Sequence, residues 1–80
     1  MYINKEINFF HWIQNDIVID FAVPELLKNT MIEAEELDKE NNKEYFCVAE
    51  AIDMICKEYC KKRILTKEQW DLICKKYPCV

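Results

Sequence analysis

The hydrophobic and polar residues of this chain alternate with the period of an α-helix over most of its length. The clearest segment, residues 44–63, has an apolar residue at nearly every third or fourth position along one side. That side consists of Tyr45, Val48, Ala49, Ile52, Ile55, Cys56 and Tyr59. We therefore expect residues 43–63 to form the central, core-facing helix of a small bundle.

Two further helices are expected before this one. Residues 4–20 carry apolar side chains around much of a helical circumference, although Ile17–Val23 is rich enough in β-branched residues to be extended instead. Pro24 fits the first turn of a second helix over 23–40. Its predicted buried stripe is Leu26, Leu27, Thr30, Met31, Ala34 and Leu37.

Local signals mark where the later helices begin and end. Asn41 and Asn42 break the pattern after the second helix, and Asn adopts the left-handed conformation more readily than most residues. Thr66 and Gln69 have the spacing of a capping box at the start of a last helix. The sequence thus predicts an all-α fold, a single-domain bundle over residues 1–80 with four helices at about 4–20, 23–40, 43–63 and 66–77.

Composition narrows the class of protein. The 80 residues are 51% hydrophobic and contain no Gly, so the glycine-rich turns that bind phosphates are missing. The most apolar window, Ile17–Val23, is much shorter than a membrane span and contains Asp20. No secretory signal is recognisable at the first residues. We therefore expect a cytoplasmic protein that does not bind membranes.

The cysteines and the single histidine offer little chemistry. Cys56 and Cys60, with Cys74 and Cys79, have spacings that would allow a zinc site with or without His11. However, the chain lacks the C-x2-C pair that is typical of zinc sites. Its five cysteines are an odd number, which does not suit a disulfide framework. Reduced thiols are the favoured interpretation. We expect no metal, no cofactor and no enzymatic activity.

Charged residues gather in two places. An acidic surface of Glu33, Glu36 and Glu40 is predicted on the second helix, and such a surface could neutralise a basic partner as inhibitors and antitoxins do. A basic surface of Lys57, Lys61, Lys62 and Arg63 is predicted at the end of the central helix.

The basic surface leads into a junction that resembles a helix–turn–helix. Residues 67–76 would then be the recognition helix, with Gln69, Lys75 and Lys76 facing DNA. The net charge of −4 and the absence of Gly from the turn argue against nucleic acid as a partner.

More apolar residues are present than the predicted core needs. The surplus residues offered as a partner-binding surface are Phe9, Trp12, Ile32, Phe46 and Met54. From these we expect a small, non-enzymatic protein-binding module whose partner is another protein or a second copy of the chain. An acidic inhibitor or antitoxin and a small helix–turn–helix regulator are the alternatives.

Overall fold

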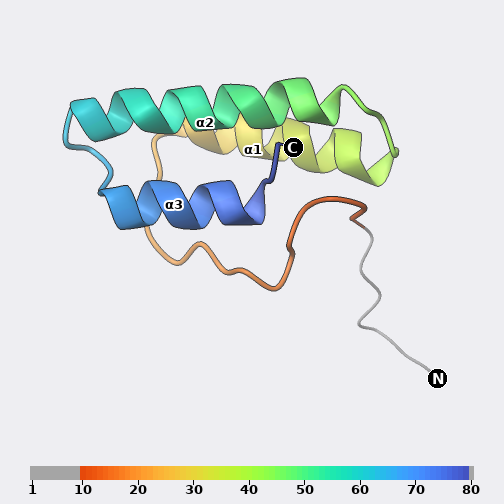
Figure 1. Ribbon diagram of the computed structural model, residues 1–80, viewed down its shortest axis with the longest axis horizontal. Coiled ribbons are helices and arrows are strands. Elements are labelled where there is room, and N and C mark those ends of the chain that lie inside the picture. The colour runs from red at the N-terminus through yellow and green to blue at the C-terminus, as the bar shows by residue number, and fades with distance from the viewer. Residues whose placement is uncertain (1–9, 80) are drawn as a thin grey trace.

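Three helices, each antiparallel to the next one along the chain, make up the regular structure of the part of the chain described by the computed structural model, residues 10–79. They are α1 (Glu25–Lys39), α2 (Tyr45–Lys61) and α3 (Lys67–Lys76). α2 packs against both α1 and α3. Figure 1 shows residues 10–24 as an irregular segment that passes below α3 in this view and then turns up to the start of α1.

The prediction of four helices is wrong. Residues 10–20, the described part of the predicted helix 4–20, contain only bends and one turn, and the region left open around Ile17–Val23 is not helical. The remainder of that predicted helix lies outside the described residues. The other three helices are present, each one or two residues shorter at either end than predicted.

A buried carboxylate binds the backbone donors of residues 11–13, which a helix over 4–20 would use internally. Asp38, near the end of α1, is 0% exposed. Its two oxygens accept the backbone N–H groups of His11, Trp12 and Ile13, with N···O distances of 3.1 Å for Trp12 and 2.8 Å for Ile13 to Oδ2. These donors are therefore bound across the fold, and the carboxylate keeps hydrogen-bond partners although it is out of water.

The same segment is also attached to the end of α3. The backbone N–H of Gln14 donates to the carbonyl oxygen of Lys76 at 2.9 Å. The ammonium group of Lys76 donates to the carbonyl oxygen of Ile17 at 2.6 Å. The segment therefore lies against the bundle where a fourth helix was predicted, and its polar backbone is bonded to α1 and α3.

The core lies between the three helices and this segment. Ile13 is buried with residues from each helix, and Trp12 stacks on Tyr45 with ring centroids 5.2 Å apart. The buried apolar residues are Ile13, Leu27, Met31, Ala34, Tyr45, Ala49, Ile52, Cys56, Leu65, Ile73 and Tyr77. Fully burying a side chain the size of Ile13 stabilises the fold by about 1.5–3 kcal/mol, so the segment contributes to stability and is more than a tail.

Two buried tyrosines join the ends of the helices. The Tyr45 hydroxyl donates to the carbonyl oxygen of Pro78 at 2.9 Å, and the Tyr77 hydroxyl donates to Glu35 Oε2 at 3.1 Å. Burial raises the pKa of both phenols, and the nearby charge of Asp38 or Glu35 raises it further. Both hydroxyls therefore remain donors at neutral pH, which these two bonds require.

Both turns between helices contain a left-handed residue. Asn41 has φ 57° and Arg63 has φ 64°. The backbone N–H groups of Arg63 and Ile64 return to the carbonyl oxygens of Cys60 and Tyr59, at 3.0 and 2.8 Å, which is the Schellman pattern. The conformation predicted for the Asn41 turn is thus present, whereas Arg63 adopts it without the local side-chain bonding that favours Asn.

The capping box predicted at the start of α3 is confirmed. The backbone N–H of Gln69 donates to Thr66 Oγ1 at 3.1 Å, and the N–H of Thr66 donates to the Gln69 side-chain oxygen at 2.9 Å. This reciprocal pair needs only residues three apart, which is why the sequence alone revealed it.

Replacing Asp38 by alanine should destabilise the protein by about 3 kcal/mol or more, because several backbone donors would lose their buried acceptor at about 1–3 kcal/mol each. Urea unfolding would measure the change. Glu33→Ala, which removes an exposed acid from the same helix, is the control and should shift stability by less than about 0.5 kcal/mol. Equal effects of the two substitutions would contradict the anchoring role of Asp38.

Arg63→Gly should raise the free energy of unfolding by about 0.5–1 kcal/mol, because Gly adopts positive φ without a Cβ clash. Asn41→Gly is the matched control at the other left-handed position and should gain less, since Asn already tolerates this conformation. Thermal unfolding of both variants tests this. A loss of stability for Arg63→Gly would show that its side chain matters more than its backbone conformation.

Candidate functional site

A surface groove lies between the start of α1 and the second half of α2. Its volume is about 450 Å³, and apolar and basic side chains line it together. We call it the apolar–basic groove and define it by Leu26, Met54, Ile55, Lys57, Glu58, Tyr59, Lys61 and Lys62. Two of the large exposed apolar side chains of the described fold, Leu26 and Met54, meet a concentration of positive charge there.

Leu26 shows where the sequence prediction of the core was wrong. It was assigned to the buried stripe, but its side chain is 58% exposed while Leu27 is fully buried. Adjacent helical positions point about 100° apart, so the two cannot both lie at the centre of one face. The buried positions Leu27, Met31 and Ala34 set that face, and Leu26 is left at its edge.

Met54 faces away from the core on α2. Its side chain is 67% exposed, while Ile52 and Cys56 on either side of it in the sequence are buried. Met54 was predicted as a partner-binding residue, and the structure leaves its thioether open to solvent beside Ile55. Because a Met side chain is flexible and polarizable, it can adapt its shape to an apolar partner.

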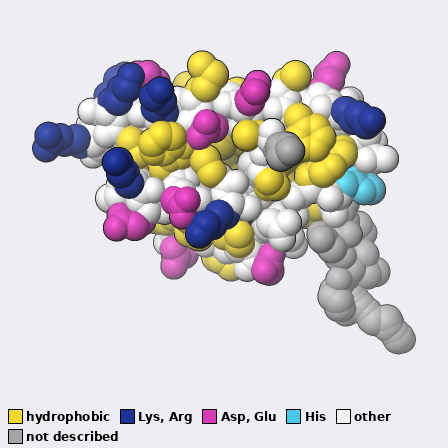
Figure 2. All heavy atoms as spheres, viewed as in Figure 1, with side chains coloured by type: hydrophobic (Ala, Val, Ile, Leu, Met, Phe, Trp, Pro, Cys, Tyr) yellow, Lys and Arg dark blue, Asp and Glu magenta, His cyan; other side chains and the backbone are white. Residues whose placement is uncertain are grey.

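Basic side chains form the rim of the groove. Lys57, Lys61 and Lys62 line it and are exposed, as is Arg63 just beyond it. Figure 2 shows Lys and Arg side chains gathered at the left end of the molecule, beside exposed hydrophobic atoms. Lys61 pairs with Glu58 at 3.6 Å, but both side chains are more than 60% exposed, so this pair neutralises little of the positive charge.

The other predicted partner-binding residues do not extend this surface. Trp12 and Phe46 are half-buried against each other, with ring centroids 4.8 Å apart, so the predicted aromatic surface is largely used inside the fold. Ile32 is 44% exposed on α1 but does not line the groove. Phe9 lies outside the described residues.

The predicted acidic surface is exposed on α1 and is separate from the groove. Glu33, Glu36 and Glu40 are all open to solvent. None of them lines the apolar–basic groove. The acidic and basic surfaces therefore remain two distinct features of the described fold.

Two of the three side chains proposed to face DNA are bonded within the protein. Gln69 completes the capping box, whereas Lys75 pairs with Asp71 at 3.2 Å in an ion pair whose two side chains are each 66% exposed. Lys76 holds the carbonyl oxygen of Ile17. Lys75 thus stays open to solvent, and the helix–turn–helix alternative stays a prediction.

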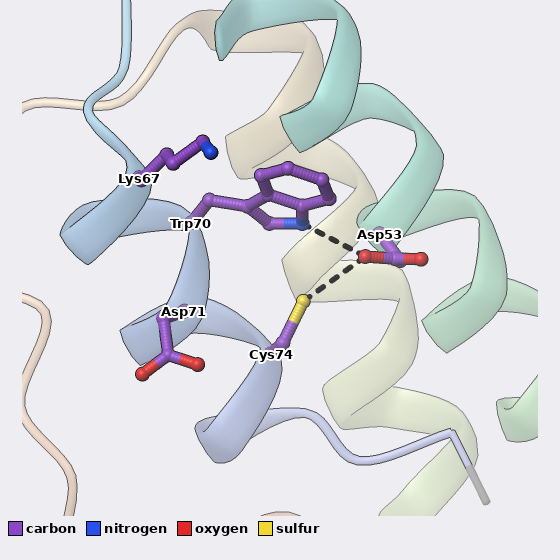
Figure 3. Close-up of a pocket in the computed structure, with 5 residues that line it drawn as sticks. All are labelled: Asp53, Lys67, Trp70, Asp71 and Cys74. Carbon is purple, nitrogen blue, oxygen red and sulfur yellow. Dashed lines mark hydrogen bonds between the residues drawn. The ribbon is translucent and has the colours of Figure 1, made fainter.

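A second hollow, of about 470 Å³, lies between α2 and α3 (Figure 3). Its lining residues are Asp53, Lys67, Trp70, Asp71 and Cys74. The Trp70 indole N–H and the Cys74 thiol both donate to Asp53 Oδ1, at 2.8 and 3.2 Å. The carboxylate therefore joins α2 to α3.

This arrangement makes Cys74 a poor nucleophile. Burial, followed by the hydrogen bond to Asp53 and its negative charge, raises the pKa of the Cys74 thiol to about 12. Burial also raises the pKa of Cys56 to about 12. Both remain neutral thiols near pH 7, whereas the reactive form of cysteine is the thiolate. Among residues 10–79, no group of three or more metal-binding side chains is suitably placed to hold a metal ion.

No protein-family model matches the chain, and searches of curated proteins and of solved structures also found no match. Within the described residues, none of the helices combines the length and the apolar character needed to cross a membrane.

Alkylation with iodoacetamide at pH 8 should modify Cys47 and Cys79, which are exposed, well before Cys56 and Cys74. A pKa of about 12 instead of 9.0 lowers the thiolate fraction about a thousandfold, so Cys56 and Cys74 should react at least about tenfold more slowly even if local opening contributes. Time-resolved peptide mass spectrometry measures each site. Labelling in 6 M urea is the control and should remove the difference; early modification of Cys74 in the native protein would contradict its assigned environment.

Proposed function

We propose that this protein is a small, non-enzymatic protein-binding module of the cytoplasm and that the apolar–basic groove is its contact surface. The observation that carries the proposal is the joint exposure of Leu26 and Met54, from two different helices, in one groove with a basic rim. Protein interfaces commonly have an apolar core surrounded by a polar rim, as this groove does.

The groove has features that favour a macromolecule over a small metabolite. It is bordered by long, exposed lysine side chains, and its apolar floor is not enclosed by the described fold. Small-molecule sites usually bury most of their ligand in a cleft with a few fixed polar groups. A shallow groove between two helices instead suits a partner that brings its own packed side chains.

The inhibitor or antitoxin alternative has one supporting observation, the exposure of Glu33, Glu36 and Glu40 on α1. Charge alone steers association and adds specificity more than affinity. The groove therefore has the stronger support, because it adds apolar area to charge.

The test replaces the two exposed apolar residues. In a pull-down from a lysate of the cells that make this protein, the immobilised wild type should retain a partner. The Leu26→Ser and Met54→Ser variants should each fail to retain it. Val18→Ser is the control, because Val18 is 70% exposed but lies outside the groove. Substitutions at exposed sites change stability little, so all three variants should fold.

Light scattering measures the molar mass of the same proteins. A dimeric wild type and a monomeric Met54→Ser variant would identify a second copy of the chain as the partner. Retention of the same proteins by all three variants, with no change in oligomeric state, would refute the groove as the contact surface. Loss of the partner only when Glu33, Glu36 and Glu40 are replaced by lysine would favour the inhibitor alternative.

A further inference from the structure

The charge of the groove is opposite to that of the rest of the protein. Residues 57–63 contain four bases and one acid, a net charge of +3, in a chain whose net charge is −4. The remaining residues thus together carry −7. Such a local excess of positive charge attracts acidic groups toward one end of a molecule that otherwise repels them.

The spacing of the lysines adds a geometric constraint. Lys57 and Lys61 are four residues apart on α2, so they lie about one helical turn, roughly 6 Å, from each other along the rim. Carboxylates four residues apart on a second helix have the same spacing.

The apolar floor of the groove indicates that a helix bound there would also need apolar side chains on the face that carries its carboxylates. Leu26 and Met54 come from antiparallel helices, and half-buried Ile55 and Tyr59 continue the floor along α2. A groove between two packed helices accepts the ridge of a third, whose apolar residues recur at every third or fourth position.

On the basis of the proposed function, we infer that the apolar–basic groove binds an acidic amphipathic helix of a partner protein. Its apolar residues would pack on Leu26 and Met54, and its carboxylates would pair with Lys57 and Lys61. Glu58, which lies between these lysines in the sequence, would disfavour acidic residues directly opposite it and so help to set the register.

Nucleic acid and anionic lipid are negatively charged like an acidic helix, but they fit the apolar floor of the groove less well than such a helix does. Proteins that bind single-stranded nucleic acid combine a positive groove with aromatic side chains on which the bases stack, and the only aromatic residue lining the described groove, Tyr59, is half-buried. A helix uses both the apolar floor and the regular lysine spacing.

The experiment uses two labelled 18-residue model peptides with the same leucine face, one with glutamates and the other with lysines on its polar face. Fluorescence anisotropy should show the acidic peptide binding wild-type protein at least tenfold more tightly than the basic one. Raising the salt concentration from 20 to 200 mM should weaken binding several-fold, because the rim charges are exposed.

Charge reversal locates the site. Lys57→Glu with Lys61→Glu should weaken binding of the acidic peptide at least tenfold. The control, Lys43→Glu with Lys75→Glu, makes the same change in net charge at exposed lysines outside the groove and should weaken binding less than threefold. Leu26→Ser with Met54→Ser should also weaken binding, which confirms contact with the floor.

Several results would overturn the inference. They are no binding of the acidic peptide at 1 mM protein, equal binding of both peptides, equal effects of the two lysine pairs, or tighter binding of labelled single-stranded DNA or phosphatidylserine vesicles. If peptide binding fails while Met54→Ser still loses the retained partner, the groove binds a partner of different chemistry. If Met54→Ser has no effect in either assay, the proposed function fails as well.

Discussion

The carboxylate of Asp38, held by the backbone N–H groups of three successive residues, is the interaction on which the rest of this fold depends. A buried charge is costly unless it is fully hydrogen-bonded, and His11, Trp12 and Ile13 supply those bonds. In return, the bonds fix the segment that places Trp12 on Tyr45 and Ile13 in the core. A segment without helical structure can therefore take the place of a fourth helix.

The sequence predicts the three helices well because their signals are local. Helical periodicity, the Thr66–Gln69 capping box and the left-handed Asn41 each involve residues within a few positions of one another. The structure of residues 10–20 depends instead on an acceptor more than 20 positions away, which periodicity cannot reveal. One signal was available: Asp38 continues the spacing of the buried Leu27, Met31 and Ala34, which places an acid on the core face.

The candidate site was predicted only in part, for a related reason. The basic residues and Met54 were recognisable on α2, but Leu26 was assigned to the core, and the way α1 packs on α2 decides that it is exposed. The aromatic residues show the opposite error. Trp12 and Phe46 looked like surplus surface, yet the irregular segment brings them together. Removing them from the interaction surface leaves a smaller groove defined by aliphatic, thioether and ammonium groups.

The attachment of the N-terminal segment to the last helix has a consequence for the order in which the protein folds. The Lys76 ammonium group bonds to the carbonyl oxygen of Ile17, 59 positions away in the sequence, and the Lys76 carbonyl oxygen accepts the backbone N–H of Gln14. The hydrogen bonds within each helix, by contrast, join residues that are close in sequence. Contacts between distant positions form late, because closing a long loop lowers the chain entropy before the contact contributes any favourable free energy. During synthesis on a ribosome, residues 10–17 emerge early but cannot complete their bonds until α3 has left the exit tunnel. Residues 11–13 can bond to Asp38 once α1 is made, whereas Gln14 and Ile17 gain their partner Lys76 only after α3, so the segment is fixed in two stages.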